Sequence, residues 1–231
     1  MSSIKSVIKD CLDLNIKLNE LKLCFQNFGN LSLRIDKNSF VIKPSGINLS
    51  KTKSKDFPII NIKNGKSSNS KLKPSSDTPT HLEIYKKYPK INGIAHTHSY
   101  FATAWAQSCY KINIKGTTHS DFSKFPIPVT KKLTKNQIAK NYEKSIGISI
   151  VDCLKKNKIS PYFSPGILVA NHGPFAWGKT AEETIKNIEA LEIIAKLAFL
   201  TNVINPKNNI DKSLINKHFE RKHGDKAYYG Q

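Results

Sequence analysis

An apolar segment that carries two histidines, GIAHTHSYFATAWAQ at residues 93–107, most limits what this chain can fold into. The run begins at Gly93 and has the composition of a short buried strand that passes into a helix near Ser99. Side chains two residues apart in a strand point to the same face, so the imidazoles of His96 and His98 point the same way. Such a pair is suited to bind one metal ion from a rigid element. The alternative is two polar residues at a strand end, hydrogen-bonded to backbone or water.

The length and composition of the chain predict a soluble protein with a substantial core. At 231 residues the chain fits one domain, which we predict to extend over residues 1–231. No apolar stretch is long enough to span a membrane, and the N-terminus has the spacing of an amphipathic helix and not of a signal peptide. The four cysteines include no CxxC pair, so neither a disulfide framework nor a thiolate zinc site is indicated. We therefore expect an unexported protein in a reducing cytoplasm.

The formal net charge of +20 raises the alternative of a nucleic-acid-binding protein. Nearly all of the positive charge is lysine, because only Arg34 and Arg221 are arginines. Arginine supplies the bidentate contacts that most often read bases. The lysines are spread along the chain among many asparagines and isoleucines. We interpret the charge as that of a solvated surface, and we expect neither a nucleic-acid nor a membrane partner.

Alternating apolar residues early in the chain predict antiparallel strands. Leu31, Leu33 and Ile35 alternate with other residues, the DKNS sequence that follows is a turn, and residues 40–42 form a returning strand. A third strand is predicted in FPIINI, which ends at an Asn-Gly turn signal. Strands and hairpins are therefore predicted to follow the N-terminal helix.

Helices are interspersed with strands in the rest of the chain. The first three helices are predicted at the N-terminus, from an N-cap at Thr78 to Pro89, and after Ser99. Three more are predicted over 134–158, with a potential break at Gly147, from Thr180 to about Val203, and over 213–224. The stretch at 116–130 has two prolines and no period, so a structured loop is predicted there. The pattern indicates an α/β fold, with α/β/α layers around a central, largely antiparallel sheet.

His172 is the strongest candidate for a third metal ligand. It ends the apolar strand predicted at 167–170, so its side chain faces a cleft shared with the strand at 93–98. Asp77 lies just before a helix and is placed to reach the same cleft. Three neutral imidazoles and one carboxylate are suited to Zn²⁺ or a similar divalent ion. The chain has no HExxH motif, which argues against a zincin-type peptidase.

A competing motif overlaps this one. The sequence GPFAWGKT at residues 173–180 is a formal match to the phosphate-binding P-loop of nucleotide hydrolases, between a strand and a helix. Pro174 has no N–H to donate to a phosphate, and Phe175 and Trp177 crowd the space. We predict a turn for this segment and nearly continuous helix after it, which leaves no strands for a parallel nucleotide-binding sheet.

Three turn sequences form a better candidate for an anion site: FGNLS, KPSG and KPSSD. Glycine and serine at turns expose backbone N–H groups and hydroxyls, and Lys43 or Lys73 supplies positive charge. Each sequence alone is an ordinary turn. Together they indicate an anionic substrate beside a metal ion.

These segments together resemble the class II aldolase and adducin family, and within it the L-ribulose-5-phosphate 4-epimerases. The blocks that carry the resemblance extend from about residue 5 to Gln231 and are GN, KPSG, KPSSDTPTH, HTHS, GTTH-D, HGPFAWG and the terminal KAYYGQ. The terminal block is typical of the epimerases and not of the related aldolases. The sequence departs from the epimerase pattern at two positions: Asn171 stands where a serine is familiar, and Asp225 where a small residue is familiar. These departures put the rate of the reaction in doubt more than its type.

The resemblance implies a cyclic homotetramer with one Zn²⁺ per subunit and with active sites at subunit interfaces. Asp121 and Tyr229 match an acid/base pair that reaches the metal from a neighbouring subunit. The residues implied to surround the zinc are Asp77, His96, His98 and His172. Those implied to bind the substrate, chiefly its phosphate, are Gly29, Asn30, Lys43, Ser45, Gly46, Ser75 and Ser76. Supporting roles are implied for Thr117, Glu143 and His218.

The implied reaction interconverts L-ribulose 5-phosphate and D-xylulose 5-phosphate. It inverts C4, whose hydrogen is not acidic, so the C3–C4 bond has to break by retro-aldol cleavage and form again. Zinc would polarise the ketone and stabilise the charge released by cleavage, while Asp121 and Tyr229 exchange protons with the aldehyde oxygen. The alternative is a class II sugar-phosphate aldolase of the same fold, which would release the aldehyde.

Overall fold

The computed structural model describes residues 3–26, 28–49, 52–68, 70–225 and 227–229. The strands are β1 (Asn30–Arg34), β2 (Ser39–Ile42), β3 (Ile59–Asn61), β4 (Ser67–Ser68), β5 (Gly93–His96), β6 (Gly166–Val169) and β7 (Gly173–Gly178). The helices are α1 (Ile4–Glu20), α2 (Thr78–Lys87), α3 (Tyr100–Ser108), α4 (Thr117–Phe122), α5 (Lys135–Lys156), α6 (Ala181–Ile204) and α7 (Lys212–His223), with a 3-10 turn η2 (Ser54–Asp56). None of the described helices combines the length and apolar character needed to cross a bilayer.

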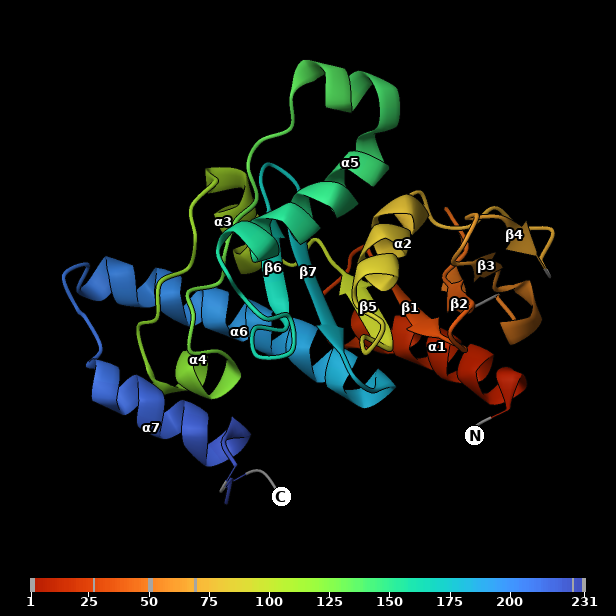
Figure 1. The fold of residues 1–231 in the computed structure, drawn as a ribbon. Coiled ribbons are helices and arrows are strands. Elements are labelled where there is room, and N and C mark those ends of the chain that lie inside the picture. The colour runs from red at the N-terminus through yellow and green to blue at the C-terminus, as the bar shows by residue number, and fades with distance from the viewer. Residues whose placement is uncertain (1–2, 27, 50–51, 69, 226, 230–231) are drawn as a thin grey trace.

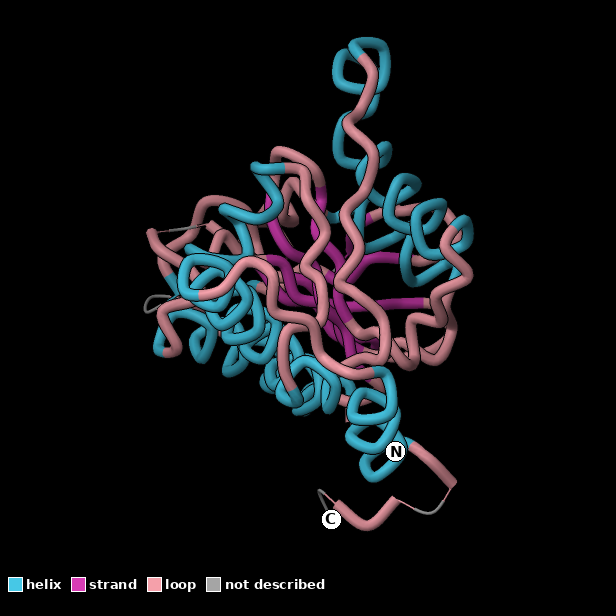
Figure 2. Tube along the Cα trace, turned by 90° about the vertical axis from the view of Figure 1, so that its left-hand side faces the viewer, coloured by secondary structure: helices cyan, strands magenta, loops and turns pink. Residues whose placement is uncertain are grey.

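The strands of the described residues form one sheet in the order β4-β3-β2-β1-β5-β7-β6, and each neighbouring pair is antiparallel. Figure 2 shows the strands running through the centre of the molecule with helices around them. Helices α1, α3 and α6 pack on one face, and α2 and α5 pack on the other (Figure 1). The predicted α/β fold with a largely antiparallel central sheet is confirmed.

The two faces of the sheet belong to two hydrophobic clusters. In β5, Ala95 packs with α1, α3 and α6, whereas its neighbour Ile94 packs with α2 and α5. In β7, Ala176 belongs to the first cluster, and Phe175 and Trp177 belong to the second. Because both faces are covered by helices, β5, β6 and β7 are mainly apolar runs and do not alternate with polar residues.

The segment GPFAWG is a strand and not the predicted turn. All six residues of β7 are buried, and the strand pairs with β5 on one side and with β6 on the other. A P-loop instead curls its successive N–H groups around a phosphate. The P-loop interpretation is therefore wrong. Glycine and proline suggested a turn, but pairing with two neighbouring strands decides the conformation.

Two element boundaries and one additional helix differ from the prediction. The strand at 93–98 ends at His96, because the chain leaves the sheet there to begin α3. Asp77, and not Thr78, is the N-cap of α2, and the prolines of the segment predicted as a loop are preceded by the short helix α4. The first two differences move element ends by a few residues, and the third adds a short helix to the predicted order.

Helix α5 breaks at Asn141 and not at Gly147. Asn141 has φ −153° and ψ 65°, outside the helical region, and the turns before it project away from the rest of the molecule (Figure 1, Figure 2). Gly147 lies instead where α5 crosses α2. A Cβ atom there would lie 2.8 Å from Cβ of Glu83 and 2.9 Å from the carbonyl oxygen of Thr80. Glycine therefore permits close helix packing here, while Thr80 donates its hydroxyl to the carbonyl of Glu143 at 2.6 Å.

This close packing predicts that one methyl group added at Gly147 lowers the stability of the protein. We expect Gly147→Ala to lower the free energy of unfolding by about 1–3 kcal/mol, because the methyl group pushes α5 away from the backbone of α2. Lys144→Ala, at an exposed position of the same helix, is the control and should change the value by less than about 0.5 kcal/mol. Chemical denaturation measures both, and equal stabilities of the two variants would contradict the close contact.

Candidate metal centre and substrate cavity

Three imidazoles converge where β5 ends and where β6 turns into β7. Nε2 of His96 lies 3.1 Å from Nε2 of His98 and 2.9 Å from Nε2 of His172. One ligand nitrogen from each ring lies within 4.8 Å of the others. Tetrahedral Zn–N bonds of about 2.0–2.1 Å would hold the nitrogens about 3.3 Å apart. The spacing in the protein suits a shared divalent cation.

The ring of His96 is fixed in the orientation that a metal ligand needs. It is buried, stacks on Phe175 with a centroid distance of 4.2 Å, and places Nδ1 2.9 Å from the carbonyl oxygen of Pro174. A carbonyl can only accept, so Nδ1 carries the proton, and the lone pair of Nε2 faces the other two rings. Hydrogen bonds of this kind orient most metal-binding histidines.

The same three histidines are held in the neutral form that binds metals. Burial, reinforced by the nearby His172 and His98, lowers the pKa of His96 well below its usual value. Burial also lowers the pKa of His98 and of His172, although the carboxylate of Asp77 opposes the shift in both. A metal ion therefore competes with few protons at neutral pH.

The turn between β6 and β7 places His172 against the end of β5. Asn171 adopts φ 60°, a left-handed conformation that asparagine tolerates better than most residues, and donates its N–H to the carbonyl of Ala106 at 2.9 Å. On the other side of His172, Gly173 lies so close to the residue that follows β5 that a Cβ atom would be 2.8 Å from the carbonyl oxygen of Thr97. Asn171 is thus compatible with the geometry of the turn that carries His172.

Asp77 borders the histidines from the start of α2. Its side chain makes no capping hydrogen bond to α2; instead, Nδ2 of Asn30 donates to Oδ2 of Asp77 at 2.7 Å. The same oxygen lies 4.0 Å from Nε2 of His96. Asn30 is the residue of β1 that pairs with His96 of β5, so the sheet itself aligns these groups.

A cavity of about 190 Å³ adjoins His98, His172 and Asp77. Residues predicted to bind the substrate or to support it line this cavity: Gly29, Asn30, Lys43, Ser45, Gly46, Ser75, Ser76 and Glu143. The cavity is also lined by Phe28 and Pro44, which belong to the predicted FGNLS and KPSG turns, and by Tyr142, which the sequence did not indicate. The only sequence signal for Tyr142 was its position next to Glu143.

Two of the predicted anion-binding turns lie side by side. The KPSG and KPSSD sequences form an antiparallel bridge at Pro44 and Pro74, in which Ser45 N–H donates to Lys73 and Ser75 N–H donates to the carbonyl of Lys43. Nζ of Lys43 in turn donates to the carbonyl of Gly29 in the third turn, at 3.0 Å. Burial lowers the pKa of Lys43, and Cys24 and Asp77 oppose the shift. The three turns thus meet around one lysine.

Four other predicted site residues lie elsewhere in the chain. Thr117, Asp121, His218 and Tyr229 belong to α4, to α7 and to the segment after α7, and none of them lines the cavity beside the histidines. Helices α4 and α7 lie side by side at the end of the molecule opposite the β6–β7 turn (Figure 1).

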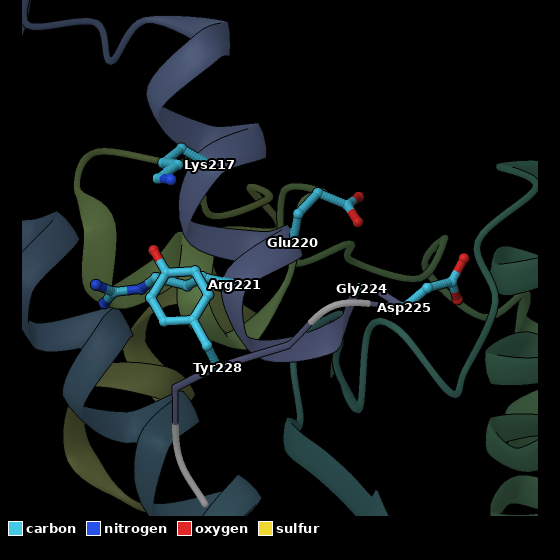
Figure 3. A pocket seen from close by; sticks show the side chains of 6 residues that line it. All are labelled: Lys217, Glu220, Arg221, Gly224, Asp225 and Tyr228. Carbon is cyan, nitrogen blue, oxygen red and sulfur yellow. The ribbon is translucent and has the colours of Figure 1, made fainter.

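Asp121 is the centre of this second group. Its carboxylate lies 3.1 Å from Nδ1 of His218 and accepts from Arg221 at 2.9 and 3.2 Å, and the guanidinium of Arg221 lies 4.1 Å from the ring centroid of Tyr229. Arg221 also lines a cavity of about 370 Å³ between α7 and the segment that follows it, as Figure 3 shows. No sequence motif gave Arg221 a role. Arg221 is, however, one of only two arginines in the chain, and arginine suits bidentate pairing with a carboxylate.

Comparison with known proteins agrees with this fold. Residues 9–199 match the family described as the class II aldolase and adducin N-terminal domain. The chain belongs to this family. Class II aldolases are typically dependent on a divalent metal ion, which agrees with the cluster of three histidines.

Solved structures of similar fold cover nearly the whole chain. An L-fuculose 1-phosphate aldolase is 23% identical with a TM-score of 0.80, and the match covers 96% of this chain and 97% of the aldolase. YgbL from Escherichia coli, described as an aldolase, epimerase or decarboxylase candidate, is 20% identical with a TM-score of 0.73, covering 93% and 98%. A sugar-phosphate aldolase from Thermotoga maritima is 18% identical with a TM-score of 0.66, covering 90% and 99%. At these identities the similarity shows the fold.

The separation of the two groups predicts different effects on metal content. We expect His96→Ala to lose a bound divalent ion, because only two imidazoles remain, whereas His218→Ala retains it. Elemental analysis after Zn²⁺ loading and gel filtration measures the metal per chain in both variants and in the unaltered protein. Loss of metal from His218→Ala, or retention by His96→Ala, would contradict the assignment of the ligands.

Proposed function

We propose that this protein is a zinc-dependent L-ribulose-5-phosphate 4-epimerase that acts as a cyclic homotetramer in the cytoplasm. The observation that carries the proposal is the position of three converging imidazoles directly beside a cavity walled by Gly/Ser turns and Lys43. A phosphorylated sugar needs both parts, a cation beside the bond that breaks and an anchor for its phosphate.

The four residues His96, His98, His172 and Asp77 would hold the ion. When bound, Zn²⁺ supplies a positive charge that polarises the ketone and stabilises the negative charge released by cleavage. The chain itself supplies the neutral state and the fixed orientation of the imidazoles. Asn30, by donating to Oδ2 of Asp77, leaves the rest of that carboxylate available to the ion.

The turns of the cavity would retain the phosphorylated fragment. Ser45, Gly46, Ser75 and Ser76 offer hydroxyls and backbone N–H groups, and Lys43 offers a positive charge. Retention distinguishes an epimerase from an aldolase. In an epimerase the phosphate anchors the aldehyde fragment, which can rotate and present its other face before the carbon–carbon bond forms again.

Asp121 and Tyr229 would exchange protons with the aldehyde oxygen in the site of a neighbouring subunit. Their absence from the cavity of their own chain supports this arrangement. An exposed apolar stripe on α6 also supports an oligomer, because four large side chains at helical spacing face outward: Ile193, Leu197, Leu200 and Ile204. Leu197 lines a cavity of about 230 Å³ together with Thr117, which connects the stripe to the second group.

A class II sugar-phosphate aldolase is the second candidate. It is favoured by the TM-score of 0.80 to an L-fuculose 1-phosphate aldolase. The terminal sequence KAYYGQ favours the epimerase, although Lys226, Gly230 and Gln231 lie outside the described residues. The two activities differ in their products, so one assay separates them.

We expect the zinc-loaded protein to convert L-ribulose 5-phosphate into D-xylulose 5-phosphate without net cleavage. A chelator should abolish the conversion, and added Zn²⁺ should restore it. Chromatography of the sugar phosphates with a parallel assay for free aldehyde measures both outcomes. Release of a ketone and an aldehyde in equal amounts from a sugar phosphate would identify the aldolase instead.

A mixing experiment tests the shared active site. Asp121→Asn and His96→Asn should each be nearly inactive alone, but subunits exchanged between them should recover up to about one quarter of the original activity, because that fraction of interfaces pairs two intact halves. A mixture of two preparations of Asp121→Asn is the control. No recovery after verified subunit exchange would place Asp121 and His96 in the same chain's site or outside catalysis.

A further inference from the structure

Tyr142 lines the cavity and contacts the candidate metal ligand His172 on the side of its ring that faces away from the other two imidazoles. Its hydroxyl lies 2.9 Å from Nδ1 of His172, whose other nitrogen, Nε2, lies 2.9 Å from Nε2 of His96. The ring of His172 is therefore held between Tyr142 and the cluster. Nothing in the sequence pattern joined these two residues, which are separated by thirty positions.

The chemistry of imidazole fixes the direction of this hydrogen bond. A neutral imidazole carries one proton, and the nitrogen that binds a metal must be the one without it. Nε2 of His172 faces the cluster, so Nδ1 holds the proton and donates it to the oxygen of Tyr142. The other tautomer would place a proton on Nε2, between the two rings, and would block the ion.

The backbone holds Tyr142 firmly in place. Tyr142 follows Asn141, the residue where α5 breaks, and so begins the part of the helix that packs on the protein. The next residue, Glu143, accepts the hydroxyl of Thr80 at 2.6 Å, and Gly147 lets α5 lie against the backbone of α2. Helix α2 begins beside Asp77. Tyr142 and Asp77 are thus parts of one packed unit.

His96 and His172 are oriented by different means. The Nδ1 of His96 faces the backbone carbonyl of Pro174 at 2.9 Å, whereas the Nδ1 of His172 faces a side chain. A backbone acceptor cannot be removed by substitution, but a phenol can. The orientation of His172 therefore depends on a side-chain oxygen, which a substitution can remove.

We infer that Tyr142 is a positioning residue that fixes the tautomer and ring orientation of His172 for metal binding. The inference rests on the metal site of the proposed function. Removal of a partner of this kind typically weakens metal affinity by about 10- to 100-fold. Tyr142→Phe deletes only the hydroxyl and keeps the ring in its place, so the fold should be retained.

The test is a double-mutant cycle on Zn²⁺ affinity, measured by competition with a chromophoric chelator. Tyr142→Phe should weaken binding by about 10- to 100-fold. In a His172→Asn background the same change should have little further effect, because the ligand through which Tyr142 acts is already gone. Tyr110→Phe, at a tyrosine that is 71% exposed, is the matched control and should leave the affinity unchanged.

A spectroscopic measurement separates positioning from general packing. The visible absorption of the Co²⁺-loaded protein should change in Tyr142→Phe, because one imidazole is reoriented, while thermal unfolding of the metal-free protein should stay the same. Equal Zn²⁺ affinities of Tyr142→Phe and the unaltered protein would overturn the inference and leave the metal site standing. Additive losses in the double variant would also overturn it, since Tyr142 would then act independently of His172. Failure of the unaltered protein to bind Zn²⁺ would overturn the metal site itself, and this inference with it.

Discussion

The antiparallel pairing of β5 with β1 and β7 is the constraint on which the site depends. His96 pairs with Asn30 on one side and with Phe175 on the other. Because neighbouring strands run in opposite directions, the end of β5 meets the start of β1 and the turn that enters β7. The FGN turn, the two histidines after Ala95 and the turn of His172 are therefore brought to one edge of the sheet. A slip of one residue would send the side chain of His96 to the opposite face and separate it from the other ligands.

Three hydrogen bonds give polar side chains at this edge a defined partner. Pro174 accepts from His96, Tyr142 accepts from His172 in the tautomer that binds metal, and Asn30 donates to Asp77. A buried imidazole without such a partner would lower stability and would not hold one orientation. The same bonds therefore serve the fold and the proposed chemistry, and little rearrangement is needed when an ion binds.

Local patterns predicted the parts of this arrangement that depend on neighbouring residues. Alternation identified β1, and the turn after it identified β2 as the returning strand. An apolar run followed by histidine identified both β5 and β6, and the three turn sequences predicted the walls of the cavity. Local patterns failed where distant contacts decide the structure. Glycine and proline in GPFAWG predicted a turn, but β5 and β6 pair with both edges of this segment. Gly147 predicted a break in α5, but contact with Thr80 requires a residue without a side chain there.

The contacts of Tyr142 with His172 and of Arg221 with Asp121 lie beyond any local pattern for the same reason, since they join residues far apart in the chain. The candidate metal ligands were easier to identify than the residues that contact them, because a ligand needs a particular chemical group in a particular element. An orienting residue needs only an oxygen or a guanidinium within reach, and many positions can supply one. Only the three-dimensional structure shows which of these positions supplies the orienting group.

The division of the site residues into two groups has a consequence for how such an enzyme would work. Each group is held by hydrogen bonds within its own chain. Pro174 and Tyr142 contact His96 and His172. Arg221 and His218 contact Asp121. Association of chains would therefore join two sets of residues that are already ordered, and the loss of side-chain entropy on assembly would be small. Under this arrangement metal binding belongs to the single chain, whereas proton transfer belongs to the assembly. Under the proposed function, the cation would be bound by one chain before a neighbouring subunit supplied its acid and base.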